Sequence, residues 1–327
     1  MLIIKYRRLF LIIGVLIVLV AASIVAFVGL RPGIDFTGGT LTEVRYETLP
    51  EKSEVENVLS SLGYDNSAVR ESHGETGQSF IVTTRTLSVD EQETVAKELL
   101  ALGDDASVLR TTTVGPVIGQ EMKDKSFWAI GATLLITIVY VAYAFIGIGK
   151  PVSSWVYGST TVLVLFHDIL VPVAVMSLLG YFYGIEVDVL FVTALLTILG
   201  YSVNDTIVIF DRVREKLVQN RTEHRKKIQE PGGITREEVE YTITRPFADL
   251  VGEAIDDTMV RSINTSLTVL IALLALYFFG SAVTETFALV LIAGVFAGAY
   301  SSVFIASPLL VAYADWQEKR YNQQHKN

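Results

Sequence analysis

The sequence predicts a membrane protein with an all-α six-span helical bundle and an α+β ferredoxin-like extracytoplasmic domain between spans one and two. Three observations favour the bundle. The first two are that 51% of the 327 residues are hydrophobic and that the mean hydropathy is +0.46. The third is that the hydrophobic residues form uninterrupted runs of about twenty, long enough to cross the ~30 Å hydrocarbon layer as helices. The predicted spans cover residues 9–30, 127–148, 155–179, 189–210, 262–279 and 287–312.

The first run could belong to a cleaved signal peptide or to a retained membrane anchor. Its apolar stretch exceeds the ~7–15 residues of a signal-peptide core, and no polar gap with a clear small-x-small cleavage site follows it. We therefore expect residues 1–30 to form an N-terminal tail and a retained first span. The second span is almost wholly apolar, which suits a helix that faces membrane lipid.

Lysine and arginine in the short connections predict the orientation, because they are enriched on the cytoplasmic side. The connections at 181–188 and 280–285 carry neither residue. Both termini are therefore expected in the cytoplasm, with an extracytoplasmic domain at 31–125, the rest of the bundle at 126–315, a cytoplasmic loop at 211–260 and a cytoplasmic tail at 316–327. The basic residues that predict this are Lys5, Arg7 and Arg8 before the first span, Lys150 after the second, Arg212, Arg214 and Lys216 after the fourth, and Lys319, Arg320 and Lys326 in the tail.

Residues 31–125 alternate between strand-like and helix-like segments in the order β-α-β-β-α-β, which is typical of a small ferredoxin-like domain. Asp90 precedes Glu93 at capping-box spacing, and Gly63 and Gly103 stand where the two helices are expected to end. His73 lies in a turn-like Ser-His-Gly, so we interpret it as a loop residue and the domain as a docking or binding module. The segments lie at 41–47, 52–62, 68–72, 79–84, 90–102 and 107–113.

Composition and motifs argue against several classes of function. A formal net charge of −9 argues against nucleic-acid binding, because backbone phosphates would be repelled. The chain has no cysteine for disulfides or thiolate sites, and no HExxH, GxSxG or Walker sequence. The glycine-rich segment 33–40 lacks the lysine and the strand-to-helix context of a phosphate-binding loop. We therefore expect no metal, no cofactor and no covalent catalysis.

Ionisable residues occur within three predicted spans, where each costs about 2.5–3.5 kcal/mol on insertion scales. The fourth span carries Asp205, on one helical face with Thr197 and Tyr201 at i, i+4 spacing. The third span carries His167 and Asp168, with Pro172 one turn later to loosen the backbone hydrogen bonds. The fifth span begins with a polar face at about the depth of Asp205, and its arginine is the expected ion-pair partner of that carboxylate. This face comprises Arg261, Asn264, Thr265 and Thr268.

Two interpretations of these polar groups remain. They could be structural pairs within the bundle, as in many membrane proteins, or they could form a proton or ion path. Three ionisable sites in three spans favour the path. Ionised Asp205 would attract Arg261, and protonation would weaken that attraction and let the helices rearrange. The sequence does not distinguish a proton from a sodium ion.

Other features have simpler interpretations. Gly294 and Gly298, continued by Ser302, form a small-residue stripe that lets two helices approach closely, so helix packing is their expected role. Residues 224–227 and the amphipathic stretch 236–259 could be a solvated face or a helix lying on the membrane surface.

Several of these motifs resemble the SecD/SecF family of protein-export membrane proteins, within the resistance-nodulation-division type of transporters. The resemblance covers nearly the whole chain, and the single small outside domain fits the SecF half of the family. The motifs that carry it are Gly33-Ile-Asp-Phe-Thr-Gly-Gly39, Val114-Gly-Pro-Val-Ile-Gly119, His167-Asp168, Gly200-Tyr-Ser-Val-Asn-Asp-Thr206 and Asp211-Arg212.

The resemblance implies a role in a bacterial cytoplasmic membrane. The chain would pair with SecD as a heterodimer and use the proton-motive force to promote late translocation of exported, unfolded polypeptides through SecYEG. The family's coupling carboxylate falls on Asp205 and its arginine on Arg261, and Asn204, His167 and Asp168 complete the predicted proton-coupling residues. One departure is that Asp256-Asp257-Thr258 and Ser262 stand where the family is expected to have Asn-x-Thr and Thr.

Two other functions stay open at this point. A half-size proton-coupled exporter of lipid or small molecules could use the same fold and the same proton-coupling mechanism, although the chain lacks a large porter domain. A non-coupled structural subunit of the channel would use the intramembrane charges only as internal pairs.

Overall fold

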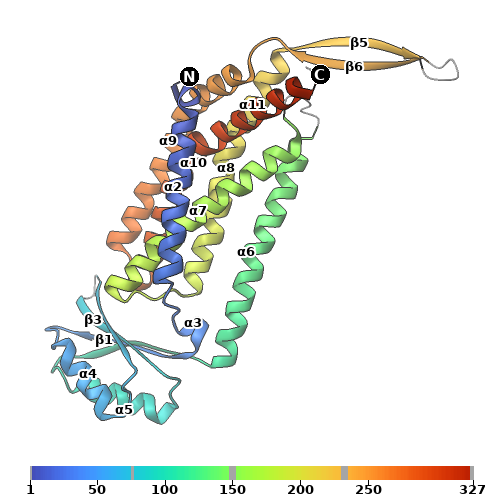
Figure 1. The fold of residues 1–327 in the computed structure, drawn as a ribbon. Helices are drawn as coiled ribbons and strands as arrows, with labels where there is room; N and C mark the ends of the chain where they lie inside the picture. The colour runs from blue at the N-terminus through green and yellow to red at the C-terminus, as the bar shows by residue number, and fades with distance from the viewer. Residues whose placement is uncertain (1, 75–76, 147–151, 230–234, 325–327) are drawn as a thin grey trace.

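The computed structural model describes residues 2–74, 77–146, 152–229 and 235–324. It consists of a long helical bundle with a small sheet domain at one end and a β-hairpin at the other (Figure 1). We call these ends the sheet-domain end and the hairpin end. The first and the last described residues lie at the hairpin end.

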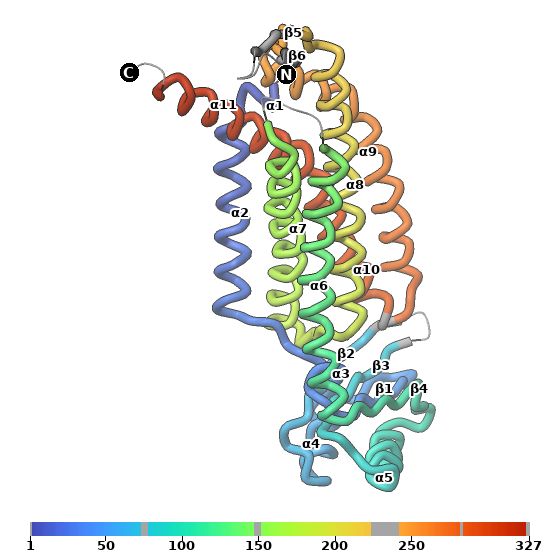
Figure 2. Tube along the Cα trace, turned by 90° about the vertical axis from the view of Figure 1, so that its right-hand side faces the viewer, coloured from blue at the N-terminus to red at the C-terminus, as the bar shows by residue number. Residues whose placement is uncertain are grey.

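Among the residues that the structure describes, six helices are long and apolar enough to span a membrane, as predicted. α8 packs against α6, α7, α9 and α10, whereas α2 and α6 expose most of their apolar side chains. The last span contains a π-helical turn at Ser302–Ala306; the first turns of α11 stay packed in the bundle and its C-terminal end leaves it (Figure 2). The spans are α2 (Arg7–Val28), α6 (Pro116–Ala144), α7 (Ser154–Tyr183), α8 (Val189–Gln219), α9 (Phe247–Phe279), and α10 (Ala282–Ser301) continued by α11 (Ser307–Gln324); the short α1 (Leu2–Lys5) precedes them.

The hairpin end differs in detail from the predicted loop at 211–260. α8 continues to Gln219, a two-stranded antiparallel hairpin follows, and α9 begins at Phe247 rather than near residue 262. The early part of α9 is helical because Leu250, Ala254 and Ile255 are buried against the bundle. The stretch 236–259 is therefore partly strand and partly helix, and the side chains of residues 224–241 lie outside the described part. The hairpin strands are β5 (Arg221–Gln229) and β6 (Thr235–Ile243).

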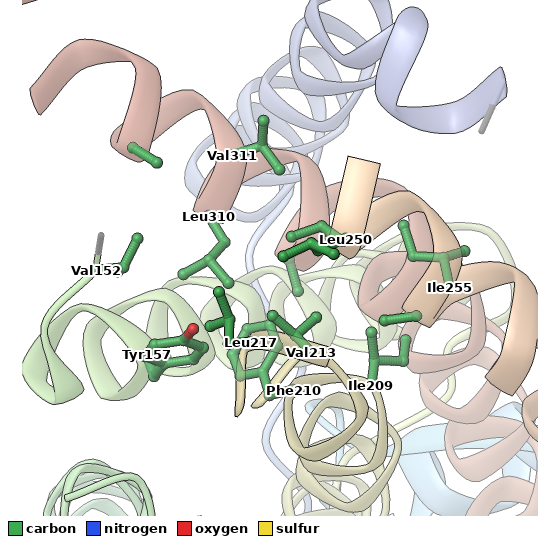
Figure 3. Close-up of a cluster of buried hydrophobic side chains, with 14 of the residues drawn as sticks. Val152, Tyr157, Ile209, Phe210, Val213, Leu217, Leu250, Ile255, Leu310 and Val311 are labelled. Carbon is green, nitrogen blue, oxygen red and sulfur yellow. The ribbon is translucent and has the colours of Figure 1, made fainter. Parts of the chain in front are cut away.

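A hydrophobic cluster at the hairpin end holds α7, α8, α9 and α11 together (Figure 3). Tyr157 of α7 stacks on Phe145, and both rings meet the Phe210 ring of α8 edge-on. Burying aromatic and aliphatic side chains at this density fixes the hairpin half of α8 in the bundle. Other members of the cluster are Val152, Ile209, Val213, Leu217, Leu250, Ile255, Leu310 and Val311.

The sheet domain has the predicted β-α-β-β-α-β order and an antiparallel sheet with strand order β2-β3-β1-β4. α4 and α5 cover the sheet face that points away from the bundle, where Val44, Phe80 and Val82 pack against Leu59 and Leu99. The other face lines a cavity of about 580 Å³ together with the α7–α8 connection. The elements are α3 (Ile34–Thr37), β1 (Gly39–Tyr46), α4 (Lys52–Ser61), β2 (Ala68–Gly74), β3 (Gly77–Thr84), α5 (Val89–Leu100) and β4 (Ser107–Val114).

The N-terminal cap of α5 was wrongly predicted at Asp90. Ser88 is the capping residue: its hydroxyl accepts the Glu91 backbone N–H at 3.3 Å, and the Glu91 carboxylate accepts the Ser88 N–H at 2.8 Å. Both Ser-x-x-Glu and Asp-x-x-Glu fit the capping pattern, and the earlier start leaves Asp90 in the first turn, where it complements the helix dipole. Gly63 ends α4 with φ +82°, as its predicted place after a helix requires.

Candidate functional site

Two polar clusters lie on adjacent faces of α8 inside the bundle. The α7–α10 cluster joins α7, α8 and α10 and comprises His167, Asp168, Ser202, Tyr300 and Ser301. The α8–α9 cluster joins α8 and α9 and comprises Tyr201, Asp205, Ser262 and Ser266. Ser202 and Asp205 are three residues apart, so α8 takes part in both clusters from neighbouring positions on its surface.

Asp168 is the centre of the α7–α10 cluster and is completely buried. Its Oδ2 accepts hydroxyl protons from Ser301 at 2.9 Å and from Ser202, and its Oδ1 lies 2.8 Å from His167 Nδ1. An ionised carboxylate only accepts hydrogen bonds, so a hydrogen bond between an ionised Asp168 and His167 requires the ring proton on Nδ1. His167 Nε2 lies 2.8 Å from the Tyr300 hydroxyl, which donates to it when the ring is neutral.

Backbone irregularities flank this cluster on two helices. Pro172 lies inside α7 and lacks the N–H that would bond the carbonyl of Asp168 four residues earlier. On the other side, Ser301 directly precedes the π-helical turn Ser302–Ala306, and such turns are frequent at functional sites. The sequence predicted the loosening at Pro172 but not the π-helical turn.

Asp205 is buried between α8 and α9. Its Oδ2 accepts hydroxyl protons from Ser262 at 3.0 Å and from Ser266 at 3.4 Å, both on α9. The Tyr201 hydroxyl donates to Ser266 at 3.1 Å and extends the chain of hydroxyls by one residue. Ser262 therefore supplies the hydroxyl at the position where the family resemblance led us to expect threonine.

Arg261 lies near this carboxylate but does not hold it in an ion pair. Its side chain is exposed on α9, and among the described residues the salt bridges within 4.0 Å do not include an Asp205–Arg261 pair. Successive residues of a helix point about 100° apart, so when Ser262 faces Asp205 its neighbour Arg261 faces outward. The Arg261 charge still acts electrostatically on the Asp205 carboxylate. Asn204 is likewise exposed, on α8.

Ion pairs join α8 to the start of α9 at the hairpin end. Asp257 Oδ2 lies 2.7 Å from Arg212 Nη2 and 2.9 Å from Lys216 Nζ. Glu253 pairs with Arg245 and lies 3.8 Å from Lys216. Asp257, one of the departures from the expected family pattern, thus braces α9 against α8 two turns or less from Ser262.

The small-residue stripe of α10 lies against α8. A Cβ atom added at Gly294 would lie 2.9 Å from Cγ2 of Ile198 and closer still to its Cγ1 and Cδ1. A Cβ at Gly298 would lie 3.0 Å from the Ser202 Cβ. The two glycines therefore allow the close approach that brings Ser301 and Ser202 to the same oxygen of Asp168.

The sequence identified the carboxylates and His167 but missed the hydroxyls that hold them. Serine and tyrosine are common in membrane helices, and neither has a spacing that marks a hydrogen bond to a distant helix. Within the described ranges, three or more histidine or acidic side chains do not gather as they would around a metal ion. The residues missed are Ser202, Ser266, Tyr300 and Ser301.

Comparison with known proteins identifies the family. The family model for the C-terminal region of the protein export membrane proteins SecD and SecF matches residues 94–232 and 234–316, and the SecD/SecF GG motif matches residues 23–48. The chain belongs to the SecD/SecF family. It is 34% identical to the protein translocase subunit SecF of Thermobaculum terrenum, over 98% of this chain and 95% of that one. It is 32% identical to that of Sebaldella termitidis, over 99% and 94%.

Solved structures agree with the SecD/SecF assignment. The crystal structure of SecDF from Thermus thermophilus, described as a translocon-associated membrane protein, matches with a TM-score of 0.79 and 31% identity over 95% of this chain and 38% of that chain. SecDF in a super-membrane-facing form matches with a TM-score of 0.64 over 99% of this chain and 39% of that one. The predicted fold, a multi-pass bundle with a ferredoxin-like domain, is thereby confirmed.

Proposed function

We propose that this chain is an accessory subunit of the Sec protein-export machinery that pairs with SecD and uses the proton-motive force to promote late translocation of exported polypeptides. The observation that carries the proposal is Asp205, a carboxylate buried in mid-bundle whose described partners are hydroxyls and not an ion-pair partner. Such a group can accept and release a proton without leaving a buried guanidinium unpaired. No step of this cycle needs covalent catalysis.

An exposed polar strip beside Asp205 supports a second membrane subunit. Arg261 in contact with lipid would cost several kcal/mol, so this surface of α8 and α9 needs a polar partner. The SecDF relative from Thermus thermophilus, of which this chain covers 37%, is long enough to contain a second half of similar kind. The exposed residues are Thr193, Thr197 and Asn204 of α8 and Arg261, Asn264, Thr265 and Thr268 of α9.

Protonation of Asp205 would change what holds α8 to α9. The ionised carboxylate accepts the hydroxyls of Ser262 and Ser266 and attracts Arg261; the neutral acid gives up most of that attraction. A proton moving down the membrane potential supplies about 2.3 kcal/mol per 100 mV, enough to bias a helix rearrangement.

The proposed setting follows the sequence prediction. The hairpin end and both termini face the cytoplasm of a bacterium, and the sheet domain lies outside, where it can meet chains leaving a SecYEG-type channel. The asymmetry of lysine and arginine between the two ends supports this orientation.

The test is gradient-stimulated secretion of a reporter in cells that lack their own subunit, complemented with this chain. Asp205→Asn should abolish the stimulation at equal expression. Asp211→Asn is the matched control, because Asp211 is exposed and lies on the same helix nearer the hairpin end. Equal stimulation in Asp205→Asn and the unchanged chain would favour a structural subunit that is not proton-coupled.

A further inference from the structure

A carboxylate from a distant segment holds the sheet-domain end of α8. The backbone N–H of Val189, the first residue of α8, donates to Asp35 Oδ2 at 3.0 Å, although the two residues are 154 positions apart. The helix's own capping residue, Asp188, accepts the Phe191 N–H at 2.9 Å. The first turn of α8 is thus held by two carboxylates, one local and one from α3, where the positive end of the helix dipole favours them.

Backbone hydrogen bonds between the same two segments reinforce this contact. Gly33 donates its N–H to the Val187 carbonyl at 2.8 Å, and Val187 donates its own to the Arg31 carbonyl at 2.8 Å. Pro32 and Val187 form a parallel bridge, and a Cβ at Gly33 would lie 3.1 Å from the Val187 oxygen. The connection before α8 is therefore paired, strand-like, with the segment that leads into the sheet domain.

The same glycine-rich segment is packed tightly into the base of the sheet domain. Gly38 has φ +75°, and a Cβ there would lie 2.8 Å from the Pro116 Cα at the start of α6. Gly39 has φ +147°, and its Cβ would lie 2.6 Å from the Thr84 carbonyl oxygen at the end of β3. Side chains cannot be added at these positions without moving backbone, so α3, the first turn of α6 and the sheet form one block.

α8 connects this block to the intramembrane carboxylate. It runs for 31 residues without a proline, and Asp205 lies about 24 Å along it from Val189 at about 1.5 Å per residue. We propose that Asp35 is a positioning residue that fixes the sheet-domain end of α8 to the sheet domain, so that a change at Asp205 is transmitted as a movement of that domain. This inference rests on the proposed function, since it assigns a route by which proton uptake reaches the outside domain.

A purely structural cap would hold α8 equally well in every state of Asp205. A transmitting contact makes the position of the sheet domain depend on Asp205 and loses that dependence when the contact is removed. The discriminating measurement is therefore how the distance between the sheet domain and the bundle responds to Asp205→Asn.

The chain has no cysteine, so two introduced cysteines can carry spin labels: Glu98→Cys on α5 and Phe279→Cys at the end of α9, both exposed. The labelled chain is reconstituted with its SecD-type partner in vesicles, and the label distance is measured with Asp205 and with Asp205→Asn. We expect Asp205→Asn to shift the distance distribution. Asp35→Ala should remove most of that shift, whereas Asp35→Asn, which keeps an acceptor oxygen, should retain it.

A further variant tests the Val189 N–H donor and leaves Asp35 unchanged. Val189→Pro removes only the N–H that Asp35 accepts, and proline is favoured at the first position of a helix, so the helix itself should persist. It should abolish the shift, as Asp35→Ala does. Val189→Ala, which keeps the N–H, and Asp65→Ala, at an exposed acid in the turn after α4, are the controls that should keep it.

A shift that survives both Asp35→Ala and Val189→Pro would overturn the proposal, and so would a distance that does not respond to Asp205→Asn in the unchanged chain. Neither result bears on the proposed function, which gradient-stimulated secretion by Asp205→Asn tests separately. Normal secretion by Asp205→Asn would instead remove the proposed function, whatever the distances show.

Discussion

Replacing Gly294 by alanine tests the close contact between α10 and α8. The added Cβ would lie 2.9 Å from Cγ2 of Ile198 and closer still to two other atoms of that side chain, which is fully buried and cannot swing into solvent. Overpacking of this kind costs about 1–3 kcal/mol. Alanine's higher helix propensity offsets about 1 kcal/mol of it.

Gly200→Ala is the matched control, because Gly200 lies on α8 and a Cβ there meets no other atom within 4 Å. It should stabilise the protein by up to about 1 kcal/mol through helix propensity alone. The free energy of unfolding should therefore differ between the two variants by about 1–3 kcal/mol, or about 5- to 150-fold in the unfolding equilibrium constant. Denaturant unfolding in detergent micelles, followed by tryptophan fluorescence, measures this difference.

A second substitution at Ile198 identifies the clash as the cause. Ile198→Ala alone should cost about 2–5 kcal/mol because it leaves a cavity. Combined with Gly294→Ala it should cost less than the sum of the two single changes, since the added methyl then has room. Additivity within about 0.5 kcal/mol would refute the reasoning, as would equal stabilities of Gly294→Ala and Gly200→Ala.

Three further outcomes are expected. Burial raises the pKa of the Glu186 carboxyl above its usual ~4.3, so the stability that this group contributes is present below that pH and is lost as the pH rises through the raised pKa. Glu186→Gln should make the melting temperature fall less steeply with rising pH in a thermal-melting series, and an unchanged slope would contradict the upward direction of the pKa shift. The Arg85 guanidinium and the α5 cap hold the pKa of Glu91 at about 2, so the stability that Glu91 contributes is present above pH ~4.3 and is lost towards pH 2. Glu91→Gln should remove this loss of stability in acid, which thermal melting at a series of acidic pH values measures. Ser262→Thr keeps the hydroxyl donated to Asp205 and should retain gradient-stimulated secretion, whereas Ser262→Ala should lower it through a hydrogen bond of about 0.6–1.7 kcal/mol; equal secretion by both variants would show that the hydroxyl is not needed.

The fold could be predicted because its signals are local. Each span is a continuous hydrophobic run, and the sheet domain alternates segments of strand and helix periodicity, so the order β-α-β-β-α-β follows without knowledge of contacts. The errors fall where local signals compete. Ser88 and Asp90 both stand three residues before a glutamate, and the first turns of α9 carry too many charges to be recognised as part of a span.

The partners of the polar residues could not be predicted, because they depend on how the helices pack. Spacing placed Asp205 and Arg261 at similar depth, but it did not show which residue of α9 faces α8. The structure puts Ser262 there and turns Arg261 outward. Likewise the contact between His167 and Tyr300 joins residues 133 positions apart and depends on the approach of α10.

The two buried carboxylates differ in how many helices hold them, and this difference indicates where α8 can move. Asp168 accepts hydrogen bonds from side chains on α7, α8 and α10, so displacing α8 there would leave a buried charge with unsatisfied positions, at a cost of about 1–3 kcal/mol for each donor lost. Among the residues that the structure describes, the hydrogen bonds to Asp205 come from hydroxyls of α9, and protonation of the carboxylate would weaken them. Proton uptake at Asp205 would therefore separate α8 from α9 before it separates α8 from α7 and α10. If Asp205 takes up a proton as proposed, the α7–α10 cluster would be the fixed point about which α8 tilts, and the far end of that tilt would be at the sheet-domain end, where Asp35 accepts the Val189 N–H.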